Sequence, residues 1–337
     1  MSYVPIMDVR KLQTTVGGTY VVTLPRELVS SLGLSRGDML SVHLENDRIV
    51  LAPTVIKPPS QSRTIRIEDF PDPKMLELAI VNLYIMGHDL AEIVSNGSMR
   101  LNQKKSIRTA TDGLMGVEII EDYSDRVVLQ TLVDPSKFEV NSLLIKFSTI
   151  CRAVLDDALK SLEVGDRSLA SDAFERGLES TRLYRLMMRI CFQALRNIRV
   201  RDAVKVPDLT SLVVRIIAVR EMGRIAYYSM KVAERVAELD TGVHGEIVDG
   251  LSDMGHVVVE MQEKAIKALV EHDPSMASEV IDRMSEVREL YERLYRIIIR
   301  RPEREAYILG LIIRAVRAVA GYAVALADDA ILEAFSR

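Results

Sequence analysis

The residues best spaced for chemistry in this chain of 337 residues lie in a stretch with helical periodicity. His256 and Glu260 are one helical turn apart, with Glu263 close behind, and an imidazole beside carboxylates could hold a metal ion. A solvated helix face explains the same spacing and is the favoured interpretation. We find no nucleophile motif and no glycine-rich phosphate loop, so the sequence predicts a protein that is not an enzyme.

Arginines concentrate late in the chain, at Arg293, Arg296, Arg300, Arg301, Arg304, Arg314 and Arg317. Guanidinium groups suit phosphate or carboxylate partners. The favoured interpretation is a set of ion pairs between helices, because glutamates such as Glu286, Glu289 and Glu292 lie in the same region.

Composition sets the wider limits. The formal net charge of −4 gives no support by itself for binding to nucleic acid. Cys151 and Cys191 lie in apolar helical patterns without metal-site spacing, which predicts buried thiols. The N-terminus lacks the blocks of a signal peptide, and Arg314 and Arg317 interrupt the most apolar stretch, residues 308–326. We therefore expect a cytoplasmic protein without membrane insertion.

Residues 1–54 form the first predicted domain, with the order strand, strand, short helix, strand, strand. The β-rich runs 8–13 and 19–24 flank two glycines that suit a tight reversal, and a helix over 27–32 ends at Gly33. A second hairpin follows over 39–44 and 48–51. Four short strands cannot bury enough surface alone, so we expect this segment to dimerise.

The segment Gly18–Leu28, followed by Leu32–Asp38, resembles the AbrB/SpoVT family, whose members interleave hairpins from two chains and bind DNA. The resemblance implies six DNA-facing residues, namely Arg10, Lys11, Thr14, Thr15, Tyr20 and Arg26. Base specificity does not follow from it. Related swapped-hairpin modules can serve mainly for dimerisation or for binding the partner of an antitoxin. Residues 1–54 contain equal numbers of basic and acidic residues, which keeps that alternative open.

A proline-rich linker is predicted over residues 55–62, because its composition suits an exposed connector. Beyond it, residues 63–136 predict a small α/β domain of order β-α-β-α-β-β. The expected elements are strands 63–67 and 89–94, helices 74–86 and 102–114, and a hairpin of 117–122 with 126–131. No phosphate-binding glycine signature occurs in this domain.

The remaining residues predict long helices and contain an internal repeat. A shift of 107 positions aligns Asp166–Ser171 with Asp273–Ser278 without a gap. The same register aligns Tyr184 with Tyr291 and Arg189 with Arg296. The third helices align at another offset, Tyr228–Glu234 with Tyr322–Asp328. We therefore expect two three-helix units, residues 137–235 and 236–337.

The repeat resembles the PhoU family. The first hairpin of a PhoU repeat is similar to the series Met254, Gly255, Val258, Glu260, Ala265, Leu269, Asp273, Met276, Ala277 and Val280. PhoU proteins carry acidic residues on each third helix that hold iron or zinc. Those positions align with Gly223 and Tyr227 in the first copy and with Arg317 and Gly321 in the second, so we expect the cluster to be lost and no cofactor to be bound. Glu221, Glu234, Asp328 and Asp329 remain as weak candidates for a residual metal site.

Together the resemblances imply a multidomain α+β protein, an archaeal-type PhoU-like phosphate uptake regulator with an AbrB/SpoVT domain. The expected function is DNA-binding transcriptional regulation of phosphate homeostasis by a homodimer or higher oligomer. The alternative is an adaptor that does not bind DNA and contacts a phosphate-transporter ATPase or a sensor kinase, with the N-terminal module serving only dimerisation.

Overall fold

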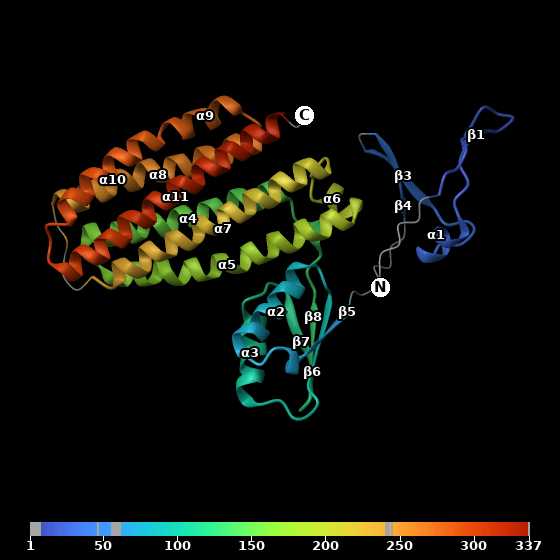
Figure 1. Ribbon diagram of the computed structural model, residues 1–337, viewed down its shortest axis with the longest axis horizontal. Helices are drawn as coiled ribbons and strands as arrows, with labels where there is room; N and C mark the ends of the chain where they lie inside the picture. The colour runs from blue at the N-terminus through green and yellow to red at the C-terminus, as the bar shows by residue number, and fades with distance from the viewer. Residues whose placement is uncertain (1–7, 46, 55–61, 240–242, 244, 336–337) are drawn as a thin grey trace. The chain divides into compact units, whose positions relative to one another are not determined.

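The computed structural model describes residues 8–45, 47–54, 62–239, 243 and 245–335 (Figure 1). The chain divides into two compact units, Met1–Pro59 and Ser60–Arg337. The predicted linker 55–62 lies outside the described residues except for its last residue, Ser62.

The first unit contains two separate hairpins and one short helix. Its elements are β1 (Gln13–Thr14), β2 (Tyr20–Val21), α1 (Arg26–Ser31), β3 (Leu40–Glu45) and β4 (Arg48–Pro53). The second hairpin matches the prediction, but the first is shorter than predicted, because β1 and β2 pair over only two residues each. Gly18 has φ of 80° in the reversal between them, where a glycine avoids strain.

The first unit has almost no core within one chain. Among its described residues, Ala52 is the one buried apolar side chain. Large apolar side chains that are more than half exposed include Val9, Leu12, Tyr20, Leu32, Met39, Val42, Leu44 and Ile49. So much uncovered apolar surface in a short segment is typical of a surface that another chain covers.

The second unit begins with the α/β domain. Its elements are β5 (Ser62–Arg66), α2 (Pro73–Ile85), β6 (Leu90–Val94), α3 (Leu101–Asp112), β7 (Val117–Asp122) and β8 (Arg126–Thr131). The sheet order is β5-β6-β8-β7, with β5 parallel to β6 and β8 antiparallel to both of its neighbours. The core between helices and sheet contains Leu76, Ile80, Ile93, Ile107 and Leu129. The predicted elements and their order are confirmed.

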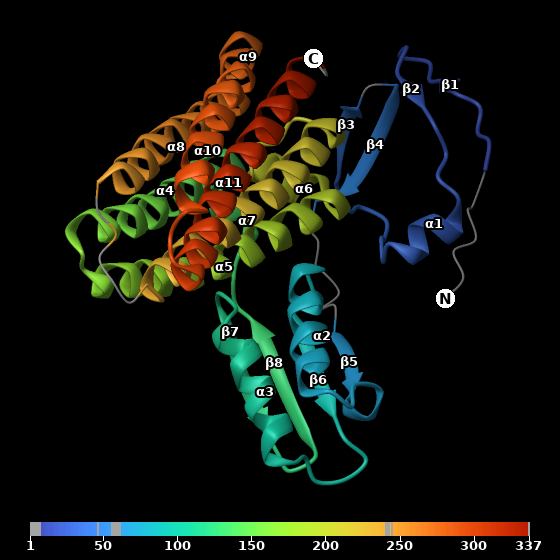
Figure 2. The ribbon, with the colours of Figure 1, turned by 60° about the vertical axis from the view of Figure 1, so that its left-hand side comes forward.

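The helical repeat forms two adjacent groups of long helices (Figure 1, Figure 2). The first copy contains α4 (Val140–Val164), α5 (Arg167–Arg196), the short α6 (Ile198–Ala203) and α7 (Leu209–Ala237). The second contains α8 (Glu246–Glu271), α9 (Pro274–Asp282), α10 (Met284–Ile298) and α11 (Glu303–Phe335). The prediction of one second helix per copy is wrong for the second copy, because Arg283 separates α9 from α10. The backbone there stays in the right-handed helical region, so the interruption is slight.

Both copies turn between their first and second helices in the same way. Gly165 has φ of 69° and His272 has φ of 58°, so each first helix ends on a left-handed residue. The next residue caps the second helix, since Asp166 accepts from the amide of Ser168 and Asp273 accepts from the amide of Ser275, both at 2.9 Å. The aligned sequences therefore build the same local structure twice.

The two copies meet along their third helices, α7 and α11. Tyr228 and Tyr322 occupy aligned positions, and their rings stack on each other with centroids 5.8 Å apart. Contact between equivalent residues indicates a pseudo-two-fold relation between the copies. The copies share one core, in which Cys151 and Cys191 are buried as expected, and burial raises the pKa of Cys191 to about 12.

Helix α11 is long and apolar enough to cross a membrane by length and composition. Its apolar residues, including Ile312, Val316 and Ala323, are instead buried where the helix packs against α7 and α8. The side chains of Arg314 and Arg317 are exposed on its outer surface. The helix therefore has the character of a core helix of the bundle.

Helix α5 also holds the α/β domain, through Arg189. Its Nη1 donates to the carbonyl oxygens of Tyr84 at 2.7 Å and His88 at 2.9 Å, and its Nη2 donates to the carboxylate of Asp89. The guanidinium also lies over the Tyr84 ring, 4.9 Å from its centroid, and the side chain is fully buried. The aligned Arg296 is 76% exposed and reaches Glu292 at 3.8 Å. The same residue type is thus buried in one copy and solvated in the other.

Candidate functional site

The six residues predicted to face DNA are all exposed in the first unit. Thr14 and Tyr20 pair across β1 and β2, and the amide of Thr15 donates to the carbonyl of Thr19 at 2.9 Å, so these three lie at one end of the first hairpin. Exposed hydroxyls and cations can contact phosphate.

The predicted cations of this set lie on either side of the hairpin in the sequence. Arg10 and Lys11 directly precede β1, and Arg10 pairs with Asp8 at 2.6 Å. Arg26 begins α1. Two cations therefore adjoin the hairpin, while the third begins a different element.

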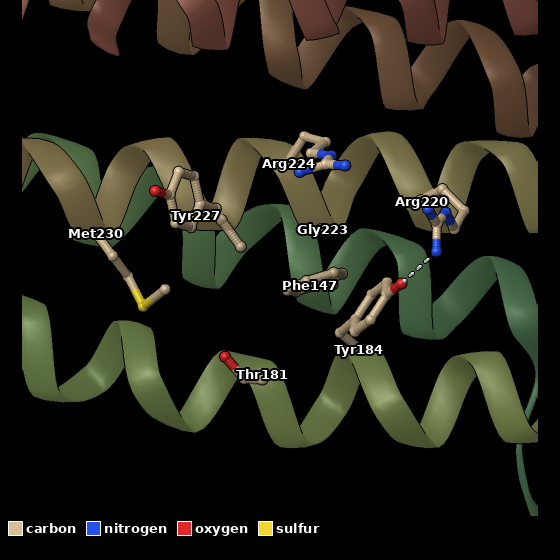
Figure 3. A pocket seen from close by; sticks show the side chains of 9 residues that line it. Phe147, Thr181, Tyr184, Arg220, Gly223, Arg224, Tyr227 and Met230 are labelled. Carbon is tan, nitrogen blue, oxygen red and sulfur yellow. Dashed lines mark hydrogen bonds between the residues drawn. The ribbon is translucent and has the colours of Figure 1, made fainter. Parts of the chain in front are cut away.

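A second candidate site lies on the third helix of the first copy. Arg220, Gly223, Arg224 and Tyr227 follow the spacing of one helix face on α7. Together with α5 and α4 they enclose a pocket of about 330 Å³. Its other lining residues are Phe147, Thr181, Tyr184, Ala226 and Met230 (Figure 3).

Gly223 lets helix α5 bring Tyr184 against α7. A Cβ atom at Gly223 would lie 2.8 Å from Cε2 of Tyr184, closer than packed side chains tolerate. In this position the Tyr184 hydroxyl faces Arg220, whose Nη1 donates to it at 3.4 Å (Figure 3). The missing side chain therefore shapes the pocket wall and places a phenol beside a guanidinium.

The pocket carries positive charge without a lining carboxylate. Within the part of the chain that the structure describes, neither Arg220 nor Arg224 forms an ion pair. Glu221 lies between them in sequence, and burial raises the pKa of its carboxyl while Arg224 and Arg220 lower it. The described residues thus give the pocket an excess of cationic hydrogen-bond donors.

The corresponding face of the second copy is different. Arg317 stands at the position of Gly223, and its guanidinium lies 4.9 Å from the ring centroid of Tyr291, the residue aligned with Tyr184. Gly321 stands at the position of Tyr227. A guanidinium therefore covers the tyrosine ring that helps to line the pocket in the first copy.

The predicted weak metal candidates do not form a metal site among the residues that the structure describes. Glu260 pairs with Arg283, and Glu234 pairs with Lys231 at 2.6 Å. His256 and Asp328 are exposed on α8 and α11. Among the residues that the structure describes, no group of three His, Cys, Asp or Glu side chains could hold a metal ion.

The aligned cluster positions also lack suitable ligands. Gly223 and Gly321 offer no side chain, Arg317 offers a cation, and Tyr227 offers a single phenol oxygen. These four residues do not fit an iron or zinc cluster.

A buried polar group lies between α7 and α11. Arg215 Nη1 is 3.5 Å from Glu333 Oε2, and both side chains are buried. Burial and the charges of Glu221 and Asp328 raise the pKa of Asp329 to about 7, while Arg215 lowers it. The residues aligned with Arg215 and Glu333 are Leu309 and Leu239, which are buried too. The contact between α7 and α11 is thus ionic at the end that contains Arg215 and Glu333 and apolar at the end that contains the aligned leucines.

Sequence reasoning missed most of these residues. Gly223 and Tyr227 were identified only as cluster positions, and Arg220 and Arg224 were not identified. Their spacing of three and four positions was a usable signal for one helix face. Thr181 and Tyr184 carried no such signal, because their place in the pocket depends on how α5 packs against α7.

Family models match the N-terminal segment and the helical repeat of this chain. A family model for the PhoU domain matches residues 144–236 and 251–330. A second model, described as antidote-toxin recognition MazE, bacterial antitoxin, matches residues 13–59. The resemblance of the N-terminal segment to AbrB-type domains and that of the helical repeat to PhoU are both confirmed, while the archaeal type stays a prediction.

Individual relatives agree with the family models. A phosphate-specific transport system accessory protein PhoU homolog from Clostridium acetobutylicum is 22% identical over 157 residues, 47% of this chain and 70% of that protein. PhoU from Pseudomonas aeruginosa superimposes with a TM-score of 0.53 at 19% identity, over 59% of this chain and 96% of that one. The phosphate transport system regulatory protein PhoU from Streptococcus pneumoniae gives 0.51 at 16%, over 58% and 93%. At these identities the structures show a shared fold, and because the PhoU domain model matches just over half of its residues, the chain belongs to the PhoU family.

Proposed function

We propose that this protein is a cytoplasmic DNA-binding regulator of phosphate uptake. The observation that carries the proposal is the presence of a MazE-type segment and two PhoU repeats in one chain. Two of the relatives named above are described as parts of phosphate transport systems, which suggests the process that this protein regulates. The N-terminal segment supplies contact with DNA, and the helical repeats supply the part that senses state or binds a partner.

The exposed apolar side chains of the first unit support a homodimer. Leu12, Val42, Leu44 and Ile49 are each more than 60% exposed, and a second copy of the same segment would cover them. A two-fold dimer presents Arg10, Lys11 and Arg26 twice, which doubles the number of phosphate contacts.

Fluorescence anisotropy with the DNA upstream of the protein's own gene tests the proposal. We expect tight binding at low salt that weakens steeply as salt rises, because each phosphate contact contributes roughly 0.9 to the slope of log K against log salt. Replacing Arg10 and Lys11 by Gln should weaken binding by about tenfold or more and reduce that slope.

Arg48→Gln is the matched control, because Arg48 is an exposed cation of the same unit that lies outside the predicted set. It should leave the affinity within about twofold. DNA binding that is absent, independent of salt, or equally reduced by both changes would contradict the proposal.

The alternative is an adaptor that binds a phosphate-transporter ATPase or a signalling kinase. The MazE description, which names toxin recognition and not DNA, is compatible with a first unit that serves only dimerisation. A chain that begins at Ser60 distinguishes the two, because the second unit is compact by itself. Under the alternative the partner still binds this shortened chain, whereas under the DNA-binding proposal the contact with DNA is lost.

A further inference from the structure

The pocket on the first copy has two ends of different character. Arg220 and the Tyr184 hydroxyl lie together at one end, and Met230 and Tyr227 lie towards the other (Figure 3). Phe147 is fully buried at the base. The pocket therefore combines a cationic hydrogen-bonding end with an apolar wall, which is the usual make-up of a small-ligand site.

The polar groups of this pocket have unused hydrogen-bonding capacity. Arg220 has one described bond, to Tyr184, and a guanidinium has five N–H donors. Arg224 and the hydroxyls of Thr181 and Tyr227 have no hydrogen bond in the described structure. Such a set of donors, two of them on charged groups, matches a ligand that carries several acceptor oxygens and negative charge.

The nearby carboxyl does not neutralise the pocket. Glu221 is half-buried on α7, its Oε2 is enclosed without a hydrogen bond, and burial raises the pKa of its carboxyl. It is absent from the lining of the pocket, whereas both arginines belong to it. An anion would therefore meet the guanidinium groups first.

The corresponding face of the second copy lacks this feature among its described residues. There Arg317 stacks on Tyr291, and the cation that replaces Gly223 is already used in that contact. In the first copy the glycine leaves the tyrosine edge open towards Arg220. The two copies share a fold, so the difference comes from these side chains.

We propose that the pocket binds a phosphate group, held by Arg220 and Arg224 with help from the Tyr184 hydroxyl. The group is either inorganic phosphate or the phosphate of a monoester whose organic part contacts Met230 and Tyr227. The volume of about 330 Å³ admits both. The proposal adds a ligand to the proposed regulatory function. Binding of the ligand does not depend on that function, but the meaning of the ligand as a signal rests on it.

Isothermal titration calorimetry of the full-length protein, without DNA, tests the site with inorganic phosphate and with phenyl phosphate. We expect at least one of them to bind, and the double change Arg220→Gln with Arg224→Gln to weaken binding by about tenfold or more. Equal affinities assign the site to free phosphate, and tighter binding of phenyl phosphate assigns it to a monoester.

Arg314→Gln is the matched control, because Arg314 is the exposed residue of the second copy aligned with Arg220, and it should leave the affinity unchanged. Tyr184→Phe keeps the ring beside Gly223 and removes only the hydroxyl, so it should weaken binding by a smaller factor. Circular dichroism confirms that each variant folds. No binding of either probe, or binding that survives the double change, overturns the proposal, and because DNA is absent this result leaves the test of DNA binding separate.

Discussion

The two PhoU repeats of this chain share a fold but differ in what several aligned side chains contact. Both have the capped turn after the first helix and both contribute an aligned tyrosine to the contact between α7 and α11. Arg189 holds the α/β domain, whereas the aligned Arg296 is solvated. Gly223 opens a cationic pocket, whereas the aligned Arg317 covers a tyrosine ring.

This difference indicates at which positions the two copies of a duplicated helical unit can differ. Caps and core contacts determine whether the unit folds, so both copies keep them. The aligned pairs Arg189 with Arg296 and Gly223 with Arg317 have different surroundings in the two copies, although both copies keep the fold. In the first copy Arg189 contacts the α/β domain and Gly223 borders a pocket. The predictions below test whether substitutions at aligned positions of the two copies have unequal effects.

The largest effect on stability is expected where Arg189 of α5 contacts the α/β domain. Arg189→Ala removes the donor to two carbonyl oxygens and to Asp89 in a fully buried setting. We expect a loss of about 3 kcal/mol in the free energy of unfolding, the low end for breaking a buried pair, because Asp89 is partly exposed. Arg296→Ala should change it by less than about 0.5 kcal/mol. Urea unfolding of both variants measures the contrast, and equal losses would refute it.

A pH-dependent effect is expected where α7 meets α11. The pKa of Asp329 is raised to about 7, so the folded protein keeps a proton that the unfolded chain loses near pH 4. Stability from this residue is therefore highest at low pH and falls as pH rises to about 7.

Asp329→Asn removes that dependence. Relative to the unmodified protein it should gain stability between about pH 4 and 7, reaching about 2 kcal/mol at pH 8, less than the full shift because Glu221 shares the titration. The comparison is Asp328→Asn, which removes an exposed charge that contributes to the raised pKa of Asp329, so it should show only a small part of this trend. Urea unfolding at a series of pH values measures both, and a gain that is independent of pH would count against the buried acid.

The smallest effects on stability are expected at two glycines on the aligned faces of the third helices. Gly223→Ala forces the Tyr184 ring to move and should destabilise the protein by about 1 kcal/mol. Gly321 has open space around it, so Gly321→Ala should stabilise the helix by about 0.7 kcal/mol. Thermal unfolding should therefore shift in opposite directions, and shifts of the same sign would contradict the proposed packing at Gly223.

The sequence determined the elements and the duplication. The hairpin of 117–122 with 126–131 has the bounds that were predicted, because alternating apolar residues and a local turn encode it. The gap-free alignment of Asp166 with Asp273 predicted a duplicated unit, and both copies build the same capped turn because a cap needs only its next few residues. The departures, which are the short first hairpin, the extra short helix α6 and the interruption at Arg283, leave the order of the predicted elements unchanged.

Only the tertiary structure decided what the aligned residues do. Arg189 and Arg296 are indistinguishable in the repeat pattern, and their burial differs because the partners of Arg189 lie about a hundred positions away in the α/β domain. Tyr184 lines a pocket because α5 packs against α7 where Gly223 has no side chain. Contacts of this kind depend on the distance and angle between packed helices, which the periodicity of a single helix does not contain.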